Sequence, residues 1–173
     1  MRWKSASRGL FGLLLGMASC ATAPDTPDPV ALLDHANDEQ RLHGFFLMDR
    51  ATMVANLPRL LRMAVDDPSP AVRREVTRQL GYTRHPSVLE VLELALDGQL
   101  SEEAAESLGY VGTDGCAVLA RRWVEAPRAP HGQFEDARLQ RALRYAFTLH
   151  HPPCREALEA LRDDHPRRVA ELP

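Results

Sequence analysis

Residues 67–97 read DPSPAVRREVTRQLGYTRHPSVLEVLELALD, and this stretch decides the fold. Val72, Val76 and Leu80 recur at helical spacing, so they form one apolar stripe. Ser69 followed by Pro70 is typical of an N-cap residue and the first helical position. We also expect Gly81 to allow the left-handed turn that commonly ends a helix. The first half of the stretch therefore predicts one amphipathic helix that ends near residue 81.

The second half of the stretch predicts a second helix. His85-Pro86 restarts the chain, and an apolar face with helical spacing follows. The members of that face are Val88, Leu89, Val91, Leu92, Ala95 and Leu96. Residues 67–97 are thus expected to form a helical hairpin.

The Leu-Gly-Tyr sequence at the end of the first helix occurs twice. Leu80-Gly81-Tyr82 returns 28 residues later as Leu108-Gly109-Tyr110, again between two amphipathic segments, and Gly109 is expected to act as Gly81 does. Self-similarity at this period indicates stacked helical units. An alignment of the second helices brings Leu57, Val88, Cys116 and Cys154 to one equivalent position. The sequence therefore predicts four hairpins, at about 38–66, 67–97, 98–126 and 134–164, with a capping tail at 165–173.

The order Asp67, a turn, Val72-Arg73 and then Leu80-Gly81 resembles the HEAT-like repeat of the PBS-lyase type. The resemblance is closest over residues 67–97, fair over 98–126 and weak in the two outer segments, which lack Leu-Gly. Terminal repeats of such stacks are commonly atypical. The resemblance implies an all-α domain over residues 38–173, built as a short right-handed α-solenoid. A chain with 45% hydrophobic but only 6% aromatic residues suits packed helices.

The N-terminus has the order of segments that is typical of an export signal. Residues 1–20 read MRWKSASRGLFGLLLGMASC: a basic start, a short apolar run, small residues and Cys20. This resembles a bacterial lipoprotein signal, so we expect a signal peptide at 1–19 and lipidation of Cys20. An Ala-x-Ala site at Ala21-Thr22-Ala23 leaves ordinary secretion as an alternative. Ala21 after the cysteine favours the outer membrane, which predicts a lipoprotein facing the periplasm rather than a soluble secreted protein.

Residues 20–37 are expected to be a flexible tether, because residues 21–30, ATAPDTPDPV, are rich in Pro and Asp and cannot bury much surface. The sequence leaves open whether Leu32 and Leu33 begin a first short helix. Loss of residues 1–19 would remove three basic residues and take the formal net charge from −3 to −6. An acidic protein has no long-range attraction for nucleic acid.

Charges on the predicted helices alternate in sign between neighbouring hairpins. Arg62, Glu93, Arg121 and Glu159 follow this order on the second helices, and Arg74 with Glu102 and Arg78 with Glu106 and Arg144 on the first. Such pairs would fix the register of the stack but stabilise it little. The second helices are expected to form the partner-binding surface, with the loop at 127–133 as a mobile contact segment. The candidate residues are Arg59, Arg62, Glu90, Glu93, Arg121, Arg122, Glu156 and Glu159.

Cys116 and Cys154 raise the question of a disulfide in an oxidising compartment. The axes of packed helices are about 9–10 Å apart. If the Cα atoms at equivalent positions have the same separation, they are too far apart to form a disulfide. The favoured prediction is therefore two small buried thiols. Trp123 is expected in the core, whereas Tyr82 and Tyr110 are candidates for a surface role. His150 and His151 point in different directions on a helix, so no metal or other cofactor is predicted.

Catalytic signatures such as Gly-x-Ser-x-Gly or His-Glu-x-x-His do not occur in the sequence. The sequence therefore favours a non-catalytic, monomeric domain, held at the membrane of the bacterial cell envelope by a lipid anchor, that binds another protein. One alternative is an envelope lipoprotein with a purely structural role. Another is a lyase-like enzyme, which the resemblance to bilin lyase repeats brings into consideration.

Overall fold

The computed structural model describes residues 27–130, 132–150 and 152–171, and every regular element in those ranges is a helix. The predicted signal peptide and Cys20 lie outside the described residues. The helices are α1 (Pro29–Leu32), α2 (Asp38–Phe46), α3 (Arg50–Ala55), α4 (Leu57–Asp66), α5 (Pro70–Gln79), η1 (Leu80–Thr83), η2 (Pro86–Val88), α6 (Leu89–Ala95), α7 (Ser101–Val111), α8 (Thr113–Glu125), α9 (Ala137–Leu149), α10 (Pro153–Glu159) and α11 (Pro166–Ala170). The predicted all-α class is confirmed.

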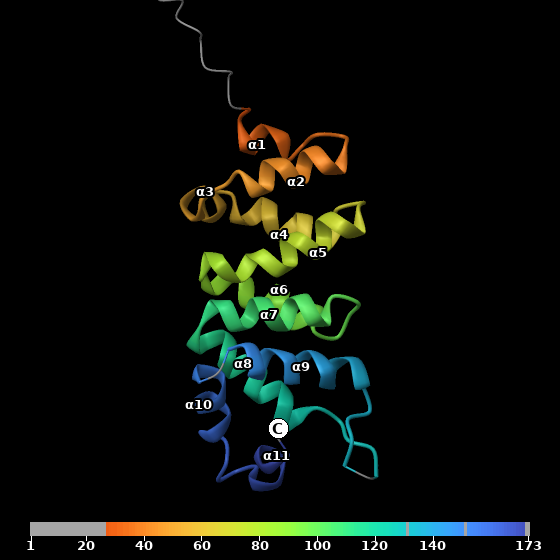
Figure 1. The fold of residues 1–173 in the computed structure, drawn as a ribbon, viewed down its shortest axis with the longest axis vertical. Helices are drawn as coiled ribbons and strands as arrows, with labels where there is room; N and C mark the ends of the chain where they lie inside the picture. Colours follow the sequence, from red (N-terminus) through yellow and green to blue (C-terminus); the bar gives the residue numbers. More distant parts are fainter. Residues whose placement is uncertain (1–26, 131, 151, 172–173) are drawn as a thin grey trace, which may run out of the picture.

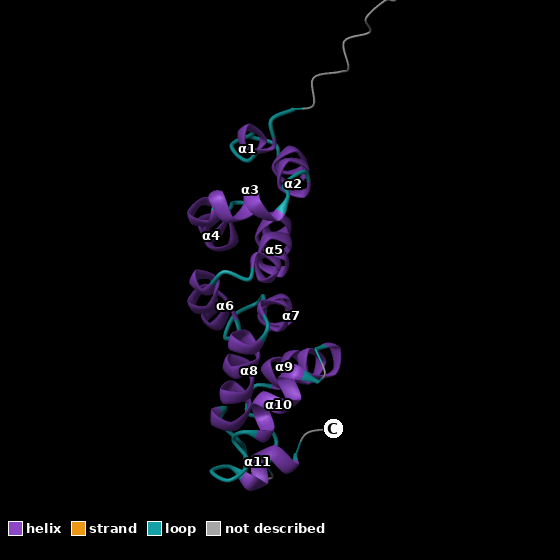
Figure 2. Ribbon diagram, turned by 90° about the vertical axis from the view of Figure 1, so that its left-hand side faces the viewer, coloured by secondary structure: helices purple, strands orange, loops and turns teal. Residues whose placement is uncertain are grey.

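The helices follow one another along the long axis of the molecule (Figure 1). Seen from the side, α2, α5, α7 and α9 form one row, in which each helix packs on the next (Figure 2). The helices α4, α6 and α8 lie alongside this row, and α10 packs on α8. Contacts between helices that are distant in the sequence therefore occur mainly between neighbours in this row.

The apolar stripe predicted for the first helix of residues 67–97 belongs to the core. Val72, Val76 and Leu80 are fully buried, as is Leu92 on α6. One continuous cluster of buried apolar residues runs from Leu33 to Val169. A single core thus connects the described helices from α1 to α11.

The folded part begins earlier than the predicted boundary at residue 38. Residues 29–32 form α1, which packs on α2, and Leu33 is buried. Gly44 allows this contact, since a Cβ there would lie 2.5 Å from the Cβ of Leu32. The apolar residues at 32 and 33 therefore belong to the folded domain rather than to a tether.

A buried ion pair connects α2 to the start of α5. The guanidinium of Arg41 donates to both carboxylate oxygens of Asp67, over 2.9 and 2.7 Å, and to two backbone carbonyls of the α1–α2 connection. Hydrogen bonding to Asp67 raises the pKa of Arg41. Ser69 holds the predicted N-cap position, but its hydroxyl donates to Asp38 on α2, which lowers the pKa of Asp38. The turn before α5 is thus fixed by the preceding helices.

The predicted role of Gly81 and Gly109 is wrong. Neither has a positive φ; within the described residues the positive values occur at Arg84, Gly112 and Gly132, at φ 51°, 100° and 81°. Both glycines instead allow close packing, because a Cβ on Gly81 would lie 2.0 Å from the backbone oxygen of Ser107. A Cβ on Gly109 would lie 1.8 Å from the His150 ring. The repeated glycine therefore marks the points where successive segments touch.

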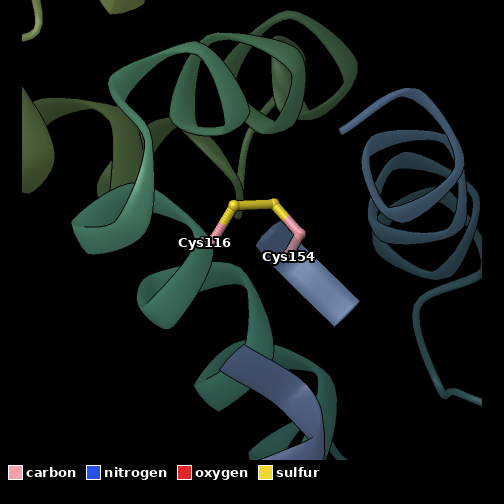
Figure 3. Close-up of a disulfide and its surroundings, with 2 residues drawn as sticks. All are labelled: Cys116 and Cys154. Carbon is pink, nitrogen blue, oxygen red and sulfur yellow. A yellow bond between two sulfur atoms is a disulfide. The ribbon is translucent and has the colours of Figure 1, made fainter. Parts of the chain in front are cut away.

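The prediction of free thiols is also wrong, because Cys116 on α8 and Cys154 on α10 form a disulfide (Figure 3). Their Cα atoms are 4.5 Å apart, and both side chains are fully buried. The error lay in using an axis spacing as a Cα distance. Each Cα lies about 2.3 Å from its helix axis, so facing Cα atoms on axes about 9 Å apart approach to about 4.5 Å. Equivalent positions on neighbouring helices can therefore be bridged.

Candidate interaction surface

The eight residues predicted to bind a partner lie on four helices. Arg59 and Arg62 are on α4, Glu90 and Glu93 on α6, Arg121 and Arg122 on α8, and Glu156 and Glu159 on α10. They therefore extend along the molecule, as the alignment of the second helices requires.

Many of these charges are neutralised within the protein. Arg121 donates to both carboxylate oxygens of Glu93, over 2.6 and 2.8 Å, which confirms the predicted pairing between α6 and α8. Arg122 pairs with Asp97, and Arg59 with Asp34. The candidate surface is thus largely occupied by its own ion pairs.

The predicted alternation does not extend to the end of the row. Glu159 pairs with Arg155 on the same helix and with Arg162, three residues further along the chain, rather than with Arg121. Three members of the predicted set are exposed and make no ion pair within the described residues: Arg62, Glu90 and Glu156. They are on three different helices, so they do not suggest one site.

An apolar groove of about 430 Å³ opens beside this surface. Its walls come from the end of α4, the first two turns of α5, the end of α6 and the connection at 98–100. Val65 and Leu94 line it and leave 58% and 68% of their surfaces exposed. The α4–α5 and α6–α7 connections lie at the same edge of the molecule (Figure 1). The groove therefore exposes large aliphatic side chains that the core does not use.

The groove was not predicted from the sequence, although one residue pointed to it. Leu94 falls outside the apolar face of its helix, which comprises the residues from Val88 to Leu96 named above. A large apolar residue on the polar side of a helix indicates either a second contact or an exposed patch. Val65 gave no such indication, because no apolar periodicity at the end of α4 set this residue apart from its neighbours.

A polar hollow of about 370 Å³ adjoins the groove at the start of α7. The two hollows share Arg74 and Gln99 in their walls. The charged residues that line the polar hollow are Arg74, Arg78, Arg138, Arg141, Glu102 and Glu103. Four arginines and two glutamates therefore line the hollow, and two further glutamates, Glu75 and Glu106, pair with Arg78 from outside its lining.

The first-helix charges pair much as predicted, with a shift by one residue. Arg74 lies 3.3 Å from Glu103 rather than beside Glu102, and Glu102 accepts from Arg141 at 2.8 Å. Arg78 is shared, since its guanidinium lies 3.5 Å from both Glu103 and Glu106. The predicted partner Arg144 instead lies 5.9 Å from the centre of the Trp123 ring.

Aromatic rings form a short ladder across η1, α7 and the end of α9. The rings of Tyr82 and Tyr110 stack at 4.2 Å, and Tyr110 meets His150 edge to face at 4.7 Å. The neighbouring Tyr110 hydroxyl, with partial burial, raises the pKa of Tyr82 to about 12. Burial lowers the pKa of His150. Tyr82 remains 42% exposed, so one end of the ladder is accessible.

The connection at 127–133 is closed at its base. Arg128 pairs with Phe134 across an isolated β-bridge, and its guanidinium lies 3.3 Å from the centre of the Phe134 ring. The same guanidinium donates to the backbone oxygen of Trp123. Trp123 is fully buried, as predicted, and its indole N–H donates to the carbonyl of Arg168 beside α11. The loop and the C-terminal helix are therefore anchored on the same tryptophan.

No group of three metal-ligating side chains occurs within the described residues. His151, one of the two adjacent histidines that the sequence analysis rejected as metal ligands, lies outside them. Among the helices that the structure describes, none is both long and apolar enough to cross a membrane. The chain matches no protein-family model, and no curated protein is similar to it.

Proposed function

We propose that this protein is a non-catalytic interaction module that binds another protein through the groove between α4, α5 and α6. The observation that carries the proposal is the exposure of Val65 and Leu94 on the two rims of one hollow. Contiguous exposed apolar surface on a soluble domain is typical of a contact site. The volume of the groove, about 430 Å³, lies within the range of pockets that bind ligands, about 300–1,000 Å³.

The row of helices fits the proposed architecture, a short right-handed α-solenoid of about four HEAT-like hairpins over residues 38–173. Each of the four proposed hairpins contains at least one helix of the row α2, α5, α7 and α9. Stacks of this kind bind partners along continuous surfaces made by several repeats. The groove has that character, since three helices and one connection contribute to it.

The proposed location is the bacterial cell envelope, with a lipid on Cys20 and the domain facing the periplasm. The buried Cys116–Cys154 disulfide supports an oxidising compartment, because structural disulfides are rare in reducing cytoplasm. A plainly secreted or periplasmic protein is the alternative. Mass spectrometry of the intact protein distinguishes them, since lipidation adds a diacylglyceryl group to Cys20.

In-cell photo-cross-linking tests the proposed function. A photoreactive amino acid replaces Leu94 in one variant and Glu90 in another, because both residues are exposed on α6 but only Leu94 lines the groove. We expect a discrete protein adduct from position 94 and a much weaker one from position 90. An adduct from position 90 alone would move the site to the charged surface first predicted. The absence of adducts from both positions would favour a purely structural role.

A further inference from the structure

We propose that the groove and the adjoining polar hollow together bind a peptide segment of the partner in which an apolar side chain stands beside acidic ones. The inference rests on the proposed function and adds the chemistry of the partner. Its starting point is that the two hollows adjoin, because Arg74 and Gln99 line both of them. A ligand whose apolar side chain lies between Val65 and Leu94 therefore has its neighbouring groups at the arginines.

The arginines of the hollow have free donors. Arg74 meets Glu103, and Arg141 meets Glu102, in each case through Nε. Their terminal Nη groups make no hydrogen bond within the part of the chain that the structure describes. The side chains are 57% and 69% exposed. The forked Nη edge of a guanidinium is the geometry that binds a carboxylate with two parallel hydrogen bonds.

The start of α7 adds two further features that favour an anionic group. Its N-cap position is held by Leu100, which offers no side-chain acceptor, so the first amides of the helix lack a capping partner. Ser101 lines the same hollow, is 1% exposed, and its hydroxyl has no hydrogen-bond partner within the described residues. Buried hydroxyls normally have a hydrogen-bond partner, and this hydroxyl can donate to an anionic group bound at the start of α7.

The glutamates of the hollow do not fill this role completely. Glu103 is shared between Arg74 and Arg78, and Arg78 also reaches Glu75 and Glu106. Glu102, Glu103 and the neighbouring Glu75 and Glu106 thus equal the four arginines in number, but they do not use every donor. Arg138 makes no ion pair within the described residues, and the Nη groups of Arg74 and Arg141 remain free for one or two carboxylates of a partner. The exposed side chains of Val65 and Leu94 can contact an apolar side chain, while the exposed guanidinium groups nearby bind carboxylates next to it. We therefore assign a peptide that carries both kinds of side chain.

Fluorescence anisotropy on the full chain tests the inference with three labelled decapeptides. The first has Leu-Val-Leu-Glu-Glu at its centre, the second Leu-Val-Leu-Lys-Lys and the third Ser-Ser-Ser-Glu-Glu, each flanked by Gly and Ser. We expect the first to bind at least tenfold more tightly than either control, a difference of about 1.4 kcal/mol. Its affinity should fall as the salt concentration rises.

Three variants locate the binding. Arg74→Gln and Arg141→Gln should each weaken binding of the first peptide about fivefold and leave the second unchanged. Arg155→Gln is the matched control, because Arg155 is exposed but lies on α10, paired within its own helix. It should change nothing.

The outcomes separate the two proposals. Equal binding of all three peptides, no binding up to 1 mM, or unchanged binding by Arg74→Gln would overturn the acidic-peptide assignment. Binding of vesicles of anionic phospholipid in competition with the first peptide would also overturn it, in favour of a lipid. If any of these results occurs while position 94 still cross-links a protein, the proposed function stands and only the chemistry of the partner is wrong. If neither cross-links nor peptide binding is found, both proposals fail.

Discussion

The Cys116–Cys154 disulfide offers a test of the C-terminal half of the fold. Its cysteines are 38 residues apart in the sequence. The loss of chain entropy in the unfolded state that such a loop causes corresponds to about 4 kcal/mol, and native disulfides contribute about 2–5 kcal/mol. The double variant Cys116→Ala, Cys154→Ala should therefore lower the free energy of unfolding by about 3 kcal/mol.

The assay is urea denaturation followed by circular dichroism, with and without dithiothreitol. The reductant should destabilise the wild-type protein to the level of the double variant and leave the variant unchanged. Cys20→Ala is the control for the third cysteine and should respond to the reductant as the wild type does. The reasoning is refuted if thiol labelling of the denatured, unreduced protein finds Cys116 and Cys154 free, or if the double variant unfolds at the wild-type urea concentration.

Three further predictions concern packing, the buried ion pair and pH. Gly81→Ala should destabilise the protein by about 2–3 kcal/mol in the same assay, because a Cβ there meets a backbone oxygen of α7; Gly98→Ala, whose Cβ has its nearest neighbour at 3.5 Å, should be near neutral. Asp67→Asn should lower the melting temperature and cost about 3 kcal/mol by leaving the buried guanidinium of Arg41 without its charged partner; a change below 1 kcal/mol would show the pair to be dispensable. Burial lowers the pKa of His150 in the folded protein below its unfolded value, so stability should fall as the pH drops below about 6.5, and His150→Gln should reduce this loss measured between pH 7 and pH 5.

The fold class and the helix positions could be predicted because the apolar period and the proline positions are local properties. Pro70 stands at the start of α5 and Pro86 at the start of η2, as the sequence analysis expected. The stripe of Val72, Val76 and Leu80 is buried for the same reason. Each of these features depends on residues within one or two helical turns.

The errors arose where two segments distant in sequence meet. The repeated glycines suggested helix ends, but their missing side chains make room for Ser107 and His150 of the following segments. The disulfide depends on which sides of α8 and α10 face each other. The repeat register alone does not give the distance between the Cα atoms of the two cysteines. Glycine is favoured both at the end of a helix and where two segments pack closely, so the sequence alone could not distinguish these two roles.

The candidate surface shows the same division. The alternating charges were correctly predicted to meet at Glu93 and Arg121, because the register of the stack brings equivalent positions together. The groove depends on how far α4, α5 and α6 stand apart, and the sequence does not encode that separation in a periodic pattern. Its discovery required the arrangement of the helices in space.

The central claim is that the groove between Val65 and Leu94 binds a protein. The most direct measurement places the photoreactive amino acid at Val65, in cells, with and without Leu94→Asp on the opposite rim. Because Leu94 is 68% exposed, this substitution should change the free energy of unfolding by no more than about 0.5 kcal/mol. The account predicts one discrete adduct that disappears in the Leu94→Asp variant while the protein remains folded; an adduct of equal yield in both, or none in either, would contradict it.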